Sequence, residues 1–324
     1  MLENIQIPDL ICPFPSALSP YTEAVQENIN GWMESYHLLK TELAVKRFKA
    51  GKFAWTTGRA HPTASFEDIL LVATWMSWLF MLDDLCDEEE LGRHPERLQA
   101  LHTDLIQHMN HPKMMTAEDS NIISSLIEIW GRMRTQATPQ WVERFMQTFD
   151  DYARGCLWEA NNRARNIIPS AADYMEMRRL TSALYIFFDL IELADHIQLP
   201  AEVLDHDSVR QLKLLANDGV AWFNDIVSLE KELRTNDVHN LVIVLQHEHQ
   251  LTLQQAIDNA AQIFNERIQL YCDLEAQVPS FGTEIDGELA RYLAGLRYWV
   301  RGNIDWSYET GRYGQTSKQP VSQK

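Results

Sequence analysis

The chain has 324 residues, 45% of them hydrophobic and 10% aromatic, a composition that supports a large core and excludes a disordered protein. Its 28 lysines and arginines and 46 aspartates and glutamates give a formal net charge of −18, which disfavours binding to nucleic acid or to anionic membrane surfaces. The four cysteines are far apart and form no CxxC pair, as expected of a reduced, cytoplasmic protein without a disulfide framework or a thiolate metal site.

Four prolines fall within the first twenty residues, so we predict an irregular arm over residues 1–20, without the apolar segment of a signal peptide. From 21 to 314 the apolar residues recur mainly at helical spacing, and strand-like alternation is scarce. The sequence therefore predicts an all-α fold of about ten helices in a single domain, 21–314, followed by a polar tail over 315–324.

Apolar runs and capping residues mark individual helices. The strongest apolar run, 69–82, has fourteen residues, fewer than the roughly 20 needed to cross a bilayer, so we predict a buried helix and no stable membrane insertion. Thr138-Pro139 predicts a helix start, and Thr252 with Gln255 predicts another that has a capping box. Connections between helices are predicted at His61-Pro62, Gly92 to Pro95, His111-Pro112, Ile168-Pro169 and Pro200.

The predicted buried helix leads directly into an acidic cluster, DDLCDEEE at 83–90, which contains six carboxylates. These charges repel one another, and the macrodipole disfavours them near a helix C-terminus, so a cation is expected to offset them. Asp83 and Asp87 are four residues apart and share a helix face, so both can reach one hard cation. The alternative interpretation is a solvated acidic cap on a core helix, and the pattern leaves open which of Asp84, Asp87 and Glu88 bind metal directly.

A second polar pattern is NDIVSLEKE at 224–232. Because a helix turns by about 100° per residue, Asn224, Ser228 and Glu232 form one stripe of side-chain oxygens along a helix face. An amide, a hydroxyl and a carboxylate suit Mg²⁺, whose remaining positions are filled by water and phosphate oxygens. Lys231 precedes the last of them and can contact the same anion. Taken alone, such a stripe is also typical of a solvated helix face.

The two motifs, in this order and about 140 residues apart, resemble the metal-binding motifs of bacterial class I terpene synthases. Members of that family carry an arginine 46 positions before the asparagine, which senses the diphosphate, and Arg178 occupies that position. They end with an Arg-Tyr pair that binds the diphosphate, matched here by Arg312-Tyr313. The resemblance spans nearly the whole chain and implies a helical bundle around a central apolar active-site cavity.

One part of the family pattern differs in this chain. Family members commonly have Asp three residues after the sensing arginine and Gly after that, whereas this chain has Thr181 and Ser182. In the family, the residue at the position of Ser182 is called the effector, and its role is assigned to its backbone carbonyl. Ser182 has this carbonyl as well. How Thr181 links that carbonyl to Arg178 stays open.

The resemblance implies an enzyme that ionises and cyclises a prenyl diphosphate, with farnesyl diphosphate as the expected substrate. It implies three Mg²⁺ ions per active site, replaceable by Mn²⁺, which stabilise the leaving group as Lewis acids. Two ions would be held by Asp83, joined by Asp87, and the third by Asn224, Ser228 and Glu232. The side chains that would donate hydrogen bonds to the diphosphate are Arg178, Lys231, Arg312 and Tyr313.

The carbocation must meet no water before its rings have formed, which requires an apolar cavity lined with aromatic faces. Phe80 is three residues before Asp83 and so lies on the same side of its helix. Trp306 stands where the family places a cavity tryptophan, and Phe187 and Trp55 are further candidates. The alternative for each aromatic side chain is ordinary core packing.

Other functions are alternatives to cyclisation of farnesyl diphosphate. A diterpene cyclase using geranylgeranyl diphosphate, or a cyclase of geranyl diphosphate, would differ in cavity size, which the sequence does not define. A chain-elongating prenyl transferase would carry a second aspartate-rich motif in place of 224–232. A non-catalytic helical binding protein would leave the spacing of Arg178 and Arg312-Tyr313 unexplained. No nucleic-acid partner is expected, and a homodimer is an alternative to a monomer.

Overall fold

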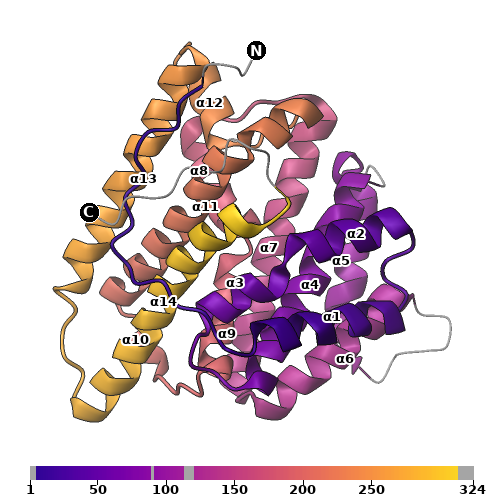
Figure 1. The fold of residues 1–324 in the computed structure, drawn as a ribbon, viewed down its shortest axis with the longest axis vertical. Coiled ribbons are helices and arrows are strands. Elements are labelled where there is room, and N and C mark those ends of the chain that lie inside the picture. Colours follow the sequence, from indigo (N-terminus) through magenta and orange to yellow (C-terminus); the bar gives the residue numbers. More distant parts are fainter. Residues whose placement is uncertain (1–4, 89–90, 113–119, 313–324) are drawn as a thin grey trace.

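The computed structural model describes residues 5–88, 91–112 and 120–312, without the side chains of 85–88, and its regular elements are all helices (Figure 1). This confirms the predicted all-α fold, although the described ranges contain fourteen α-helices instead of about ten. In chain order the elements are α1 (Thr22–Ser35), α2 (Glu42–Gly51), α3 (Phe53–Ala60), α4 (Phe66–Glu88), the 3-10 helix η1 (Leu91–Arg93), α5 (Pro95–Asn110), α6 (Asn121–Gln136), α7 (Pro139–Arg165), α8 (Ala171–Thr181), α9 (Leu184–Ala194), α10 (Ala201–Leu204), α11 (Asp207–Thr235), α12 (Leu241–Glu248), α13 (Leu253–Glu275) and α14 (Thr283–Glu309).

Some of the additional helices arise at breaks that no proline marks. Lys52 adopts φ 50° between α2 and α3, and Ala183 adopts φ 60° between α8 and α9. A left-handed residue with a side chain costs roughly 1 kcal/mol, so both breaks are held by their surroundings and leave no local sequence signal.

The helix starts that the sequence did mark are present. The Thr138 hydroxyl accepts a hydrogen bond from the Trp141 N–H at 3.2 Å, directly before Pro139 in the first turn of α7. Thr252 and Gln255 form the predicted capping box at the start of α13. Capping residues satisfy backbone groups locally, which is why these boundaries could be predicted.

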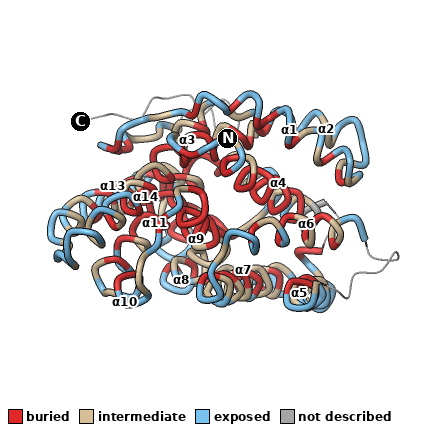
Figure 2. Tube along the Cα trace, turned by 90° about the horizontal axis from the view of Figure 1, so that it is seen from below, coloured by how far each residue is buried: buried red, intermediate tan, exposed pale blue. Residues whose placement is uncertain are grey.

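Buried residues concentrate in α4, α9, α11 and α14, with α1 to α3 on one side and α5, α7 and α8 on the other (Figure 2). Ten of the eleven residues of α9 are buried, and α4 carries the predicted apolar run 69–82. Helices that are apolar on all sides must be surrounded by others. Because the central helices are surrounded, the polar side chains near their ends lie beside side chains of neighbouring helices.

The N-terminal arm contains no helix in its described part, 5–20, and runs along α13 and α14 (Figure 1). The Asn265 side chain on α13 accepts a hydrogen bond from the Ile11 N–H at 2.8 Å and donates one to the Asp9 carbonyl at 3.0 Å. Phe14 contacts the ring of Tyr271 edge to face, with 5.3 Å between centroids. The predicted tail, 315–324, lies outside the described residues.

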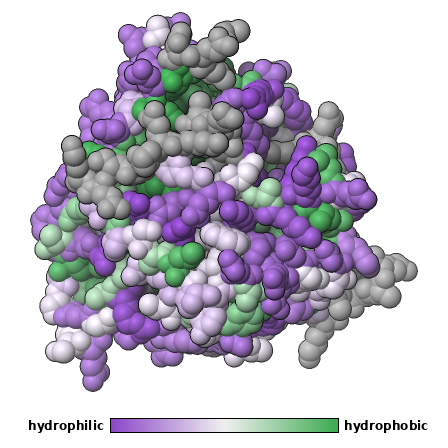
Figure 3. Space-filling model, viewed as in Figure 1, coloured by the Kyte–Doolittle hydropathy of each residue, from purple (hydrophilic) through white to green (hydrophobic). Residues whose placement is uncertain are grey.

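Within the described ranges, none of the helices combines the length and apolar character required to span a bilayer. The face of the molecule in Figure 3 is predominantly hydrophilic, with apolar side chains scattered among polar ones.

Candidate active site

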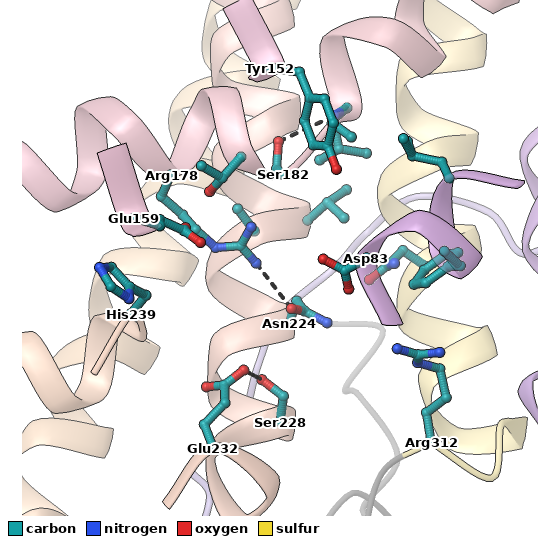
Figure 4. Close-up of a pocket in the computed structure, with 18 of the residues that line it drawn as sticks. Asp83, Tyr152, Glu159, Arg178, Ser182, Asn224, Ser228, Glu232, His239 and Arg312 are labelled. Carbon is teal, nitrogen blue, oxygen red and sulfur yellow. Dashed lines mark hydrogen bonds between the residues drawn. The ribbon is translucent and has the colours of Figure 1, made fainter. Parts of the chain in front are cut away.

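A cavity of about 370 Å³ lies among α3, α4, α7, α8, α9, α11 and α14, a volume typical of a small-molecule site. Its lining combines charged and polar side chains with aromatic ones. In Figure 4, Asp83 and Arg312 lie on one side, and Arg178, Asn224, Ser228 and Glu232 lie on the other. The predicted site residues that line the cavity are Phe80, Asp83, Arg178, Thr181, Ser182, Asn224, Ser228, Lys231, Glu232, Trp306 and Arg312.

The predicted stripe on α11 faces this cavity with all three of its oxygen-bearing side chains. The Ser228 hydroxyl donates a hydrogen bond to the Glu232 carboxylate at 2.8 Å, and the Asn240 side chain donates to the other carboxylate oxygen. Burial, together with the negative charge of nearby Asp225, raises the pKa of the Glu232 carboxyl to about 8 against the effect of these two hydrogen bonds. A divalent cation beside Asn224 and Ser228 would stabilise the charged form of Glu232, so this donor set fits a metal ion.

The described part of the chain has no group of three Asp, Glu, His or Cys side chains close enough to bind one ion. The predicted donors on α11, an amide and a hydroxyl oxygen besides the Glu232 carboxylate, are outside that class of site.

Arg178 on α8 is held between two neighbouring residues of α11. Its Nε lies 3.0 Å from the Asp225 carboxylate, and its Nη2 donates to the Asn224 side-chain oxygen at 3.0 Å. The same carboxylate accepts a hydrogen bond from the Tyr174 hydroxyl at 2.7 Å and from the Leu241 backbone N–H at 2.9 Å. Asp225 is 1% exposed, so it fixes the position of Arg178 from inside the protein.

Arg179, the neighbouring arginine, does not line the cavity. It forms a bidentate ion pair with the buried Asp218 at 2.7 and 3.0 Å. The structure therefore separates two adjacent arginines that the sequence distinguishes only by spacing, and places Arg178 at the cavity.

The helix break after α8 brings Thr181 and Ser182 to the cavity wall. The Ser182 hydroxyl bonds to the Asn217 side-chain oxygen at 2.9 Å and also lies 3.0 Å from the Arg179 carbonyl. The Thr181 hydroxyl is buried without a hydrogen-bond partner. A hydrogen bond from this hydroxyl to Arg178 is thus not part of the arrangement.

On the opposite wall, the exposed Asp83 lines the cavity near the end of α4. The adjacent Asp84 accepts a hydrogen bond from Arg312 Nη2 at 3.3 Å. The Arg312 guanidinium also lies over the Phe80 ring, 4.7 Å from its centroid, and Phe80 stacks on Phe53 at 4.5 Å. The Asp87 side chain and Tyr313 lie outside the described residues, so their predicted roles stay predictions.

Aromatic side chains from α4, α9 and α14 contribute to the apolar lining. Phe80 and Trp306 both line the cavity with ring centroids 6.1 Å apart, and Phe187 packs on Trp299 at 4.9 Å. Trp55, a further candidate from the sequence, is not among the lining residues. It is a partly exposed residue of α3 that packs against Lys52 instead.

Residues 74–269 match the model of terpene synthase family 2, C-terminal metal binding, which covers more than half of the chain. The chain belongs to this terpene synthase family. The matched residues include both predicted metal-binding motifs, Arg178 and the helix break after it. The family, the enzyme class and the fold predicted from the sequence are thereby confirmed, and a metal-binding function comes with the family.

Two named relatives and one solved structure show how far the similarity of the synthase extends. The germacrene A synthase of Nostoc punctiforme is 34% identical over 96% of both chains. The (+)-T-muurolol synthase of Roseiflexus castenholzii, named as cyclising (2E,6E)-farnesyl diphosphate, is 34% identical over 95% of this chain and 94% of its own. The crystal structure of germacradien-4-ol synthase from Streptomyces citricolor superimposes with a TM-score of 0.83 at 24% identity, covering 94% of this chain and 99% of that one.

The synthase also has polar cavity residues that the sequence motifs did not reveal. The Arg163 guanidinium bridges Glu159 at 3.0 Å and Asp237 at 2.9 Å, and Asp237 contacts the His239 imidazole at 2.9 Å. Burial alone would raise the pKa of Asp237, but the hydrogen bond from His239 and the charge of Arg163 lower it well below its usual range. The Arg163 and Asp237 pair is separated by 74 positions, so no local pattern connects them.

Proposed function

We propose that the synthase catalyses the Mg²⁺-dependent ionisation of farnesyl diphosphate and cyclises the resulting cation to a sesquiterpene, with release of diphosphate. The observation that carries this proposal is the position of Asp83 on α4 and of the Asn224 stripe on α11 at one shared cavity. Oxygen ligands, cationic side chains and aromatic faces meet there, as diphosphate departure and cation cyclisation require. The relative from Roseiflexus castenholzii, named as cyclising farnesyl diphosphate, supports this substrate.

Three Mg²⁺ ions, or Mn²⁺ in their place, would supply Lewis-acid stabilisation of the leaving diphosphate. We assign two of these ions to the α4 wall and one to the α11 wall. Their ligands in this proposal are Asp83 and Asp87 on α4, and Asn224, Ser228 and Glu232 on α11.

The cationic side chains around the cavity would hold the same diphosphate by charge-assisted hydrogen bonds. Arg178 would reach it from the α8 side, Lys231 from α11, and Arg312 from the opposite wall. Tyr313, outside the described residues, would be the fourth donor. In the structure the Arg178 guanidinium bonds to the Asn224 oxygen, and Arg312 bonds to Asp84. Binding of diphosphate would exchange these contacts for phosphate oxygens and leave the Asn224 oxygen to the metal.

The apolar part of the cavity would exclude water and shelter the cation. The rings of Phe80 and Trp306, which line the cavity, would attract positive charge. We place Ser182 and Thr181, at the helix break, beside the carbon at which ionisation begins. The catalytic domain in this proposal is 21–314, with 1–20 as an arm and 315–324 as a tail. The enzyme acts in the cytoplasm as a monomer or homodimer.

The test is to incubate the pure protein with geranyl, farnesyl and geranylgeranyl diphosphate, with Mg²⁺ and with chelator, and to analyse extracts by gas chromatography and mass spectrometry. A Mg²⁺-dependent cyclic sesquiterpene from farnesyl diphosphate is expected. A preference for geranylgeranyl diphosphate would establish the alternative, a diterpene cyclase. Linear elongation products would indicate a prenyl transferase, and no metal-dependent product from any of the three would refute the proposal.

A further inference from the structure

The apolar part of the cavity contains polar atoms that none of the roles above uses. The Asn303 side-chain oxygen on α14 and the Thr56 hydroxyl on α3 are both buried without a hydrogen-bond partner. Asn303 and Thr56 line the cavity and are 9% and 2% exposed. A buried polar group without a partner costs roughly 1–3 kcal/mol, so each such group calls for a reason.

These groups come from two helices that pack against each other. Gly302, next to Asn303, is so close to Arg59 that a Cβ atom there would meet the Arg59 Cβ at 2.8 Å. One turn further along α14, the Trp306 indole donates to the Gly51 carbonyl, just before α3, at 2.8 Å. Thr56 lies between these two contact points in the chain, and its side chain lines the same cavity as Asn303.

A third polar atom belongs to the same wall. The indole Nε1 of Trp299, four residues before Asn303 and thus on the same face of α14, is also buried without a partner. The Asn303 amide presents its oxygen or its NH₂ group by rotating about its last side-chain bond, and the Thr56 hydroxyl both donates and accepts. Two to four such partners are what an ordered buried water needs.

We infer that Asn303 and Thr56 hold one water molecule in the apolar cavity and deliver it to the last carbocation, so that the principal product is a terpene alcohol. The inference rests on the proposed function and adds the way in which its reaction ends. The water oxygen donates a lone pair to the cationic carbon and forms the C–O bond, and the resulting oxonium loses a proton to the released diphosphate. Water is the only co-reactant, and no electron is gained or lost.

Asn303 and Thr56 can hold this water without admitting solvent, because both are buried beside aromatic side chains. Trp299 and Trp306 flank Asn303 on α14 and are each 1% exposed. A single held water would therefore react only with a cation formed next to α14, whereas a bulk-solvated cavity would trap the first cation as a linear alcohol. The expected product is cyclic for this reason.

The experiment follows the product of the complete enzyme with farnesyl diphosphate and Mg²⁺ in H₂¹⁸O. A cyclic alcohol carrying ¹⁸O is expected as the main product. Asn303→Leu, which keeps the shape and removes the polar group, is expected to lower the ratio of alcohol to hydrocarbon at least tenfold while total turnover stays within about fivefold. Thr56→Val is expected to lower the same ratio severalfold.

Ser77→Ala is the matched control, because Ser77 is a buried hydroxyl of α4 that bonds to its own helix and does not line the cavity. Its product ratio is expected to equal that of the wild type. If Asn303→Leu fails to fold or to turn over, Thr56→Val decides the question. Hydrocarbons alone from the wild type, an alcohol without ¹⁸O, or an unchanged ratio in the deciding variant would overturn the inference while leaving cyclisation established. The absence of any metal-dependent product would instead defeat the proposed function.

Discussion

Replacing Asp225 by asparagine should show how far stability and turnover depend on the buried charge that holds Arg178 in position. The substitution keeps the shape of the side chain but removes the negative charge that pairs with the guanidinium at 3.0 Å. It also leaves Tyr174 and the Leu241 N–H donating to a weaker acceptor. Arg178 cannot lose its proton in response, because a guanidinium stays charged in proteins. Desolvation lowers the pKa of Arg178, but the charge of Asp225 together with Tyr174 and Glu159 raises it above its usual value.

The magnitude follows from the burial of the pair. The side chains of Arg178 and Asp225 are 14% and 1% exposed, so removal of one partner belongs to the buried class, for which breaking an ion pair costs about 3–5 kcal/mol. Because the introduced amide still accepts a hydrogen bond, we expect the lower end of that range, about 3 kcal/mol. Tyr174→Phe removes one hydrogen bond to the same charged group, for which we expect about 1.5 kcal/mol.

The assay is urea unfolding of both variants at neutral pH, together with steady-state turnover. Asp218→Asn is the matched control, because Asp218 is equally buried and pairs with Arg179 and Arg267 away from the cavity. The Asp218 variant should lose comparable stability and keep turnover within a few fold. The Asp225 variant should in addition lose at least about 100-fold in turnover, which corresponds to the roughly 3 kcal/mol that one positioned donor contributes to the transition state. Equal turnover losses in the two variants, or an Asp225 variant as stable and active as the wild type, would refute the reasoning.

The remaining predictions concern metal binding, acid stability and the aromatic wall. Asp83→Ala and Asn224→Ala should each lower turnover by at least about 100-fold and leave the circular dichroism spectrum unchanged, because these side chains line the cavity and are not part of the core. Near-normal activity of either variant would show that its residue does not bind the metal. Burial lowers the pKa of His102 to about 4, so protonation favours the unfolded chain below about pH 6.5, and about 2 kcal/mol of stability should be lost as the pH falls from about 7.5 to about 5. His102→Gln should abolish that part of the pH dependence in urea titrations, and replacement of the exposed His249 by glutamine should leave it unchanged; equal slopes in all three proteins would contradict the assignment. Phe80→Leu removes the ring beneath Arg312 and its stacking on Phe53. We expect a higher KM for the prenyl diphosphate in steady-state kinetics and a broader product mixture in gas chromatography. An unaltered product profile would show that Phe80 serves only core packing.

The oxygen stripe and the capped starts of α7 and α13 could be predicted because their signals are local. Asn224, Ser228 and Glu232 recur every four residues, so any helix through them aligns their oxygens, whatever surrounds it. Thr138 and Thr252 satisfy backbone groups within the same turn, which makes them readable in the sequence. The apolar run before Asp83 likewise required that its helix be buried.

The tertiary structure alone decided which groups meet across the cavity. Asp225 acquires its role only when α8 packs on α11 and brings Arg178 to it, and Arg163 joins Asp237 across 74 positions. The break at Ala183 is held by its neighbours against its own backbone preference. Helical periodicity and capping act within a few residues, whereas a cavity with unpaired groups such as Asn303 exists only where the surfaces of separate helices fail to fill the space between them.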